Sequence, residues 1–292
     1  MRKYPSMTRL VLLCSLCLLP LAARSADEKA EGAPKVEWVH GPAKADVGGN
    51  AEIMIPSGFI FTGKKGTVHL MQAMGNLTND AEEGFLAPAD VFEKGAKNPW
   101  FVVFEFNDMG YVKDEEKKSI DKDKILSGMK DGVNSGNEER VKRGLPKMEL
   151  VGWAVEPHYD EATHNLEWGI LLKTEKGGEV VNYDVRLLGR KGVMQCTLVL
   201  DPGQLDRTLP KFRSTLAQFA YKTGEKYAEY REGYKLAKIG LTALIGGGVA
   251  VAAWKLGFFK YFGKFILLIV VGFGAAFKKL WTRFFGRKEG LD

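Results

Sequence analysis

Four stretches of alternating apolar and polar residues follow one another between positions 147 and 200. Turn-forming residues separate them, and each stretch has the two-residue period of a β-strand. The predicted strands are Glu149–Glu156, Leu166–Lys173, Glu179–Leu188 and Val193–Leu200. Because the connections between them are short, the pattern predicts an antiparallel meander.

The apolar positions of these strands predict a sheet with one buried face. They are Val151, Trp153 and Val155 on the first strand, Leu166, Trp168, Ile170 and Leu172 on the second, and Val181, Tyr183, Val185 and Leu187 on the third. A helix is expected to cover the sheet, because apolar residues next recur at spacings of three and four. Its stripe is Leu209, Phe212, Leu216 and Phe219. Thr208 is the expected N-cap, Pro210 lies in the first turn and Gly224 ends the helix.

The N-terminal half carries shorter signals. Strands are expected at Ala51–Pro56, Phe59–Phe61 and Trp100–Phe106, the last buried on both faces because it is apolar almost throughout. Helices are expected at Val68–Met74 and, in a polar region with three glycines, within 125–143. The predicted fold class is α+β, an antiparallel sheet meander covered by helices. The element order resembles the sandwich of the photosystem-II P-protein and Mog1, which implies a fold and no function.

The N-terminus has the order of a secretory signal: basic residues, an apolar run and then small residues. Arg2, Lys3 and Arg9 precede the run Leu10–Pro20, and cleavage after Ser25 makes residues 1–25 the signal peptide. An uncleaved N-terminal anchor is the alternative, although a run of about eleven residues is shorter than the ~20 that span a bilayer. Residues 26–35 form a polar, flexible leader to an extracytoplasmic domain at 36–234.

Residues 235–292 are expected to anchor the chain in a membrane. A first span is predicted at about 239–259, where Lys255 is the single charge, and a second at about 265–281, before a basic tail. Two topologies are open: a hairpin of both spans, or one span followed by an amphipathic segment along the membrane. Small residues at four-residue spacing, among them Ala243 and Gly246–Gly248, permit packing against another membrane or envelope protein.

The charges are divided between the ends and the middle of the chain. Of the net charge of +6, residues 235–292 contribute +8 and residues 1–26 contribute +4, whereas residues 27–234 carry −6. An acidic middle argues against nucleic acid as a partner, because a phosphate-binding domain needs a positive face. The basic tail suits anionic lipid headgroups, so the lipid bilayer is the expected partner.

Cys196 is the one cysteine that remains after removal of the signal peptide, so no intramolecular disulfide is expected. It shares the apolar face of a predicted strand with Met194 and Leu198, which predicts a buried, inert thiol; a reactive nucleophile is the alternative. No catalytic constellation and no cofactor motif is recognised.

The segment Glu156–His164 brings two histidines and three carboxylates into one hairpin loop. Imidazole and carboxylate groups bind divalent transition metals, so His158, Asp160 and His164 are candidate ligands. The alternative is structural: Asp160 caps the turn and both histidines are solvated.

A second candidate site lies on or beside the third strand of the meander. Asn182 and Arg186 are expected on the face opposite Tyr183, and with Arg190 they are candidates for binding an anionic headgroup or a glycan; a solvated sheet face is the alternative. Tyr227, Tyr230 and Tyr234 are expected to form an aromatic belt where the chain enters the lipid.

Several short motifs resemble a family of bacterial membrane-anchored proteins, domain of unknown function 2167. They are Gly152-Trp-Ala154, Pro157-x-Tyr159-Asp160, Leu166-x-Trp168-Gly169, Asn182-Tyr183-x-x-Arg186, Leu188-Gly-Arg-x-Gly192 and Gly75-Asn76. The resemblance implies a bacterial inner-membrane protein with its main domain on the periplasmic side, and it supplies no activity. The first hypothesis is therefore a non-enzymatic envelope module for binding or scaffolding. The alternatives are a membrane-tethered hydrolase or metal-dependent enzyme that uses the 156–164 loop, and a transporter or channel subunit, which requires oligomerisation.

Overall fold

A computed structural model describes residues 36–245, apart from positions 75, 77, 94, 95, 97, 98, 143, 145 and 176 and the side chain of Glu139. The chain divides into two units, residues 1–32 and 33–292, and every described residue belongs to the second. The predicted signal peptide, the leader, most of the first span (246–259) and the whole second span lie outside the described residues.

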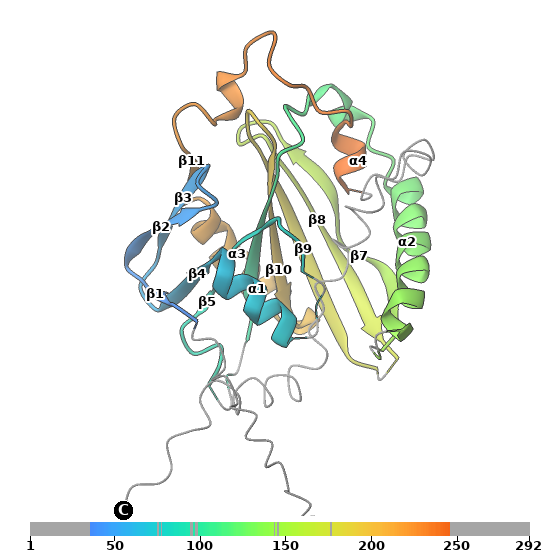
Figure 1. The fold of residues 1–292 in the computed structure, drawn as a ribbon. Coiled ribbons are helices and arrows are strands. Elements are labelled where there is room, and N and C mark those ends of the chain that lie inside the picture. The colour runs from blue at the N-terminus through green and yellow to red at the C-terminus, as the bar shows by residue number, and fades with distance from the viewer. Residues whose placement is uncertain are drawn as a thin grey trace, which may run out of the picture. The chain divides into compact units, whose positions relative to one another are not determined.

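An eight-stranded antiparallel sheet forms the centre of the described domain (Figure 1). In spatial order its strands are β1 (Val39–His40), β4 (Phe59–Gly63), β5 (Glu82–Pro88), β6 (Phe101–Asn107), β10 (Val193–Leu200), β9 (Glu179–Leu188), β8 (Asn165–Thr174) and β7 (Met148–Asp160). The predicted meander is confirmed as the run β7–β8–β9–β10. The strand predicted at Trp100–Phe106 is confirmed as β6, which pairs with β10.

In the described part of the chain, a three-stranded sheet and four helices pack around the large sheet. The small sheet contains β2 (Ala43–Val47), β3 (Ala51–Ile55) and β11 (Phe219–Tyr221) in the order β11–β3–β2. The helices are α1 (Lys64–Ala73), α2 (Lys122–Lys142), α3 (Leu205–Leu216) and α4 (Leu241–Ile245), with 3-10 turns at Glu115–Lys118, Pro202–Gln204 and Tyr227–Glu229. The described domain is thus an α+β fold, as predicted.

Both faces of the large sheet are buried, each in its own core. The first core lies under α1, α2 and α4, and the second lies under α3 and the small sheet. The prediction of one buried face was wrong. Leu166, Trp168 and Ile170 of β8 face the first core, whereas Val181 and Tyr183 of β9 face the second. The register explains this: Trp168 of β8 is paired with Asp184 of β9, and paired residues point to the same side of a sheet.

One predicted helix differs from the observed one, and another is confirmed. The helix predicted from Thr208 to Gly224 begins earlier, at Leu205, and ends at Leu216, so Pro210 lies in its interior. Phe219 belongs to β11 instead, where it pairs with Ile53 of the small sheet. The polar region within 125–143 does form a helix, because its few apolar side chains are buried in the first core at four-residue spacing. These are Ile125, Met129 and Val133.

The chain after β11 remains attached to the domain. Residues 222–240, which we call the strap, run along the upper end of the sheet in Figure 1 and lead into α4. Leu241, Leu244 and Ile245 of α4 are buried in the first core. These three residues lie within the first predicted membrane span, so the domain core extends beyond the predicted boundary at 234. Among the described residues, no helix is both long and apolar enough to cross a membrane.

Candidate functional site

Charged, amide and hydroxyl side chains form a buried cluster in the middle of the large sheet, on the side of the first core. Asp184 and Arg186 come from β9, Gln195 and Thr197 from β10, and Glu105 from β6; none is more than 8% exposed. They lie together because the register pairs Gln195 with both Arg186 and Glu105. We call these five residues and Glu82 of β5 the buried polar cluster.

Asp184 is the main acceptor of the buried polar cluster. Arg186 Nη1 donates to Asp184 Oδ1 over 3.1 Å, and Thr197 Oγ1 donates to the same oxygen over 2.7 Å. Gln195 Nε2 in turn donates to Thr197 Oγ1 over 3.1 Å. The Arg186 guanidinium also lies over the Trp168 ring, 4.6 Å from its centroid. The ion pair is therefore held between hydrogen bonds and an aromatic face, as a buried charge requires.

Glu105 is the least satisfied member of the cluster. It is 4% exposed, and its Oε2 atom has no hydrogen-bond partner among the described residues. Burial raises the pKa of this carboxyl to about 8; the charges of Glu82 and Asp184 raise it further, against the opposing effect of Arg186. At neutral pH Glu105 is therefore mainly protonated, and the cluster contains a proton-binding site.

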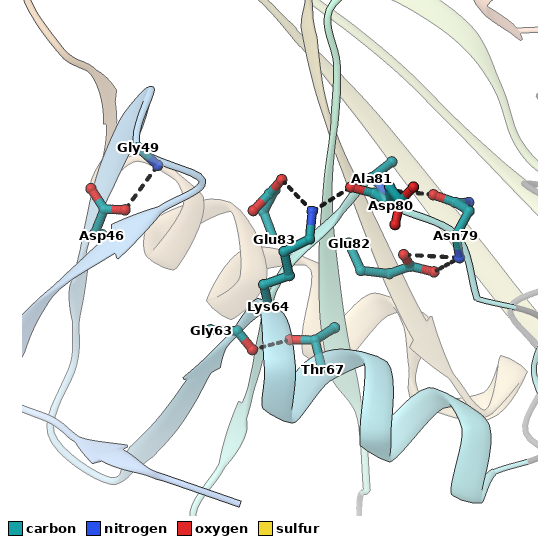
Figure 2. Close-up of polar contacts among 10 residues, drawn as sticks. All are labelled: Asp46, Gly49, Gly63, Lys64, Thr67, Asn79, Asp80, Ala81, Glu82 and Glu83. Carbon is teal, nitrogen blue, oxygen red and sulfur yellow. Dashed lines mark hydrogen bonds and ion pairs between the residues drawn. The ribbon is translucent and has the colours of Figure 1, made fainter.

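Glu82 ties the cluster to the N-terminal end of α1 through the turn at residues 79–83 (Figure 2). Both carboxylate oxygens of Glu82 accept from the backbone amide of Asn79, over 2.8 and 3.0 Å. Lys64, the first residue of α1, donates to the Asp80 carbonyl oxygen and to Glu83 Oε1. Burial raises the pKa of Glu82 as well, against the lowering effect of the Asn79 amide. The ionisation of Glu82 is thus linked to the turn at residues 79–83.

The second set of predicted site residues is divided by the structure. Asn182 and Arg186 do lie on the face opposite Tyr183, but both side chains are buried there and not solvated. Arg190 follows β9 and contacts the strap: its Nε donates to the Gly224 carbonyl oxygen, and its guanidinium lies 4.7 Å from the centroid of Tyr234. Arg186 and Arg190 therefore have different partners, and binding of an anionic headgroup or a glycan by these residues stays a prediction.

The two predicted imidazole ligands are also in different surroundings. His158 Nε2 lies 3.6 Å from Glu167 Oε2, whereas His164 Nδ1 lies 3.0 Å from the Tyr159 hydroxyl. Asp160 Oδ1 accepts from the backbone amide of Ala162 over 2.8 Å, which caps the hairpin turn. Within the described part of the chain, no group of three or more His, Cys, Asp or Glu side chains could hold a metal ion. The metal hypothesis thus gains no support from this geometry.

A polar group on the opposite face of the sheet was missed by the sequence reasoning. Glu167 accepts from the Tyr183 hydroxyl and, over 3.0 Å, from Arg213 Nη2 of α3. Burial raises the pKa of Tyr183 above its usual value, and the hydrogen bond to Glu167 raises it further. The available signal was a single carboxylate within the otherwise apolar stretch 166–172. The contacts satisfy this carboxylate and join α3 to the sheet.

Aromatic rings fasten the strap to the domain. Tyr111, which follows β6, stacks on Tyr227 and Tyr230 at centroid distances of 4.5 and 4.0 Å. The Tyr227 hydroxyl donates to the Val112 carbonyl oxygen over 3.0 Å. Tyr227 is buried and Tyr230 half-buried against the domain, which differs from the predicted aromatic belt; Tyr234 is 41% exposed.

Cys196 lies in the second core with no exposed surface. Burial raises the pKa of its thiol well above the usual value. The geometry agrees with the buried thiol expected from the strand pattern, because a thiolate is the reactive form and burial disfavours it.

Residues 39–277 match the profile of a family described as "Protein of unknown function (DUF2167)". No curated protein matches the chain.

Two solved structures show a distant similarity. Cyanobacterial PsbP (CyanoP) from Synechocystis sp. PCC 6803 has 11% identity and a TM-score of 0.35, over 66% of this chain and 96% of that chain. The Ran-binding protein Mog1p from Saccharomyces cerevisiae has 10% identity and a TM-score of 0.32, over 68% of this chain and 99% of that chain. Similarity at this level carries no argument about function.

Proposed function

The chain belongs to the DUF2167 family, and from that premise we propose that it is a non-enzymatic binding or scaffolding module attached to the outer face of a bacterial inner membrane. One observation carries the proposal: the strap is part of the folded domain and leads into α4 without a flexible linker. A module of this kind would be held in one orientation next to the segment that follows Ile245.

The strap is attached through its backbone as well as its rings. Tyr111 N donates to the Lys235 carbonyl oxygen over 2.9 Å, and Ala237 N donates to the Tyr111 carbonyl oxygen over 2.8 Å. Gly110 lies beneath this contact with φ +98°, and a Cβ atom there would be 2.8 Å from the Lys235 carbonyl oxygen. Such tight backbone contacts favour a rigid connection over a flexible tether.

Because α4 is buried, the membrane segment that we propose begins later than the first span of about 239–259 expected from the sequence. Leu241, Leu244 and Ile245 cannot contact the domain core and lipid at the same time, so the segment begins at residue 246. A span of ~20 residues from there reaches about position 265 and includes Lys255, Lys260 and Lys264. Either these lysines extend their ammonium groups to the interface, or the segment lies along the membrane with its lysines at the headgroups.

Membrane fractionation tests the attachment. The full chain and a chain that ends at Ile245 are expressed in a bacterium, and N-terminal sequencing establishes whether the leader has been removed. We expect the full chain in the membrane fraction and the shortened chain in the soluble periplasmic fraction. Resistance of the full chain to alkaline carbonate indicates a span, and release indicates an interfacial segment. A full chain in the soluble fraction, or a shortened chain that sediments after loss of its leader, contradicts the proposal.

The binding role needs a separate test. Photo-crosslinking from Val151 and Met54, two exposed apolar side chains on β7 and β3, is carried out on intact cells. We expect a discrete crosslinked product with the full-length protein but not with the chain that ends at Ile245. The enzymatic alternative predicts instead a turnover that His158→Ala and His164→Ala abolish; such an activity would replace the proposal.

A further inference from the structure

The outer edge of the strap has the chemistry of a membrane-contacting surface. We propose that residues 231–238 lie against anionic lipid headgroups, with Tyr234 and Leu236 entering the interface. This inference rests on the proposed attachment to a membrane and adds which side of the domain faces the lipid.

Leu236 is held outward by the backbone on either side of it. Its neighbours Lys235 and Ala237 make the two backbone hydrogen bonds to Tyr111, so the chain is extended and paired at this point. In an extended chain, successive side chains point in opposite directions. Ala237 accordingly packs against the first core, and Leu236 is 45% exposed. An apolar side chain is thus fixed on the outside by a rigid contact.

Tyr234 lies two residues away and is also fixed. Arg190 covers its ring, with the guanidinium 4.7 Å from the centroid, and Tyr230 meets it edge-on at 6.2 Å. Tyrosine is enriched at membrane–water interfaces, because its ring is apolar and its hydroxyl is polar. Tyr234 and Leu236 therefore form a small amphipathic edge.

The charges around this edge suit an anionic surface. Arg231, Lys235 and Lys238 are exposed, and Glu232 is the single acidic residue of the segment 231–238. A basic residue close to an anionic bilayer is attracted to its negative surface potential.

Two other acidic groups of the strap are already engaged. Glu225 pairs with Arg190 and Lys191, and Glu229 accepts from the backbone amides of Gly224 and Lys226. Lys235 is itself paired with the exposed carboxylate of Asp108 over 3.2 Å. With Arg231 and Lys238 against Glu232, the exposed part of the strap keeps a small net positive charge, which complements anionic headgroups.

The edge formed by Tyr234 and Leu236 lies close along the chain to the proposed membrane segment. Leu241 follows Leu236 by five positions, and α4 then leads to position 246. An extended chain covers at most about 3.5 Å per residue and a helix about 1.5 Å. Leu236 thus lies within about 25 Å of residue 246, where the proposed membrane segment begins. Val39, Met54, Val141 and Val151 are the other exposed large apolar residues of the described part, and they serve as comparison positions.

Spin labels on the full-length protein in liposomes with anionic lipid test the inference. Cys14 and Cys17 are replaced by serine, and Cys196 is too buried to react. Single labels are placed by Leu236→Cys, by the matched control Val151→Cys, which is 41% exposed, and by Val251→Cys in the proposed membrane segment. Collision rates of each label with oxygen, which partitions into lipid, and with a water-soluble nickel chelate are compared.

We expect the nickel-to-oxygen collision ratio at position 236 to be severalfold lower than at position 151, and the difference to shrink when anionic lipid is replaced by zwitterionic lipid. An aqueous label at 236 together with a lipid-exposed label at 251 overturns the inference and leaves the proposed attachment intact. A label at 236 that is shielded from both reagents indicates a protein contact and also overturns it. Protein that does not bind liposomes at all contradicts both proposals.

Discussion

Replacing Glu105 by glutamine should remove the contribution of one strongly shifted carboxyl to the pH dependence of folding in this protein. The substitution keeps the size and shape of the side chain but cannot ionise. The native carboxyl is buried beside Glu82 and Asp184, with a pKa of about 8 in place of its ordinary value of 4.5. A group with a raised acidic pKa is neutral in the folded state over a pH range in which it ionises in the unfolded chain.

The size of the effect follows from these two pKa values. Below pH 4.5 Glu105 is protonated in both the folded and the unfolded state, so its titration does not change the free energy of unfolding. Between pH 4.5 and about 8 the free energy of unfolding falls by about 1.4 kcal/mol per pH unit, and above pH 8 the loss levels off near 5 kcal/mol. That loss is comparable to the whole stability of many domains, which is about 5–15 kcal/mol.

Urea unfolding of the detergent-solubilised protein, followed by tryptophan fluorescence from pH 5 to 9, measures this dependence. The difference between wild type and Glu105→Gln is the relevant quantity, because Glu82 and other groups also titrate. We expect the variant to gain stability relative to wild type as the pH rises, by about 3 kcal/mol between pH 5 and 7. Glu149→Gln, an exposed position on β7, is the control and should run parallel to wild type. Parallel curves for Glu105→Gln and wild type would refute the reasoning.

Two further substitutions and one labelling experiment test the packing. Gly110→Ala places a Cβ atom against the strap and forces alanine to φ +98°. We expect the free energy of unfolding to fall by more than about 1 kcal/mol and new protease cleavage to occur within 222–240. The control Gly49→Ala, with φ +75° and open space around the added Cβ atom, should show no such cleavage. Asp184→Ala leaves Arg186 buried without its ion-pair partner and should lower the free energy of unfolding by about 3–5 kcal/mol in the same urea titration. The control Asp108→Ala removes the exposed Asp108–Lys235 pair and should lower it by less than about 1 kcal/mol. Cys196 should react with a maleimide only after unfolding, and rapid labelling of the native protein would show that the second core is open.

The sequence was informative about strands but not about the faces on which their residues lie. The apolar alternation of Leu166–Lys173 and Glu179–Leu188 predicted two correct strands within a residue or two. Which side each residue occupies depends on the register of one strand against the next, and alternation within a strand does not contain that information. The pairing of Trp168 with Asp184 therefore turned a predicted solvated face into a buried polar cluster.

The strap was missed for a related reason. Its tyrosines resemble a membrane-interface pattern when taken alone, and their stacking partner Tyr111 lies more than a hundred residues earlier in the chain. Tertiary contacts of this kind leave no local periodicity. The burial of α4 is likewise decided by the first core, since Leu241–Ile245 is apolar enough for either lipid or protein.

Backbone hydrogen exchange of the full-length protein in liposomes tests the central claim most directly, because the account requires the strap to be part of the folded domain. The Ala237 amide, bonded to the Tyr111 carbonyl oxygen, and the Tyr111 amide, bonded to the Lys235 carbonyl oxygen, report on the contact from both sides. We predict protection of both amides comparable to that of amides in β10. Exchange of both at the rate of an unstructured chain, while β10 stays protected, would show that the strap is a flexible linker and contradict the account.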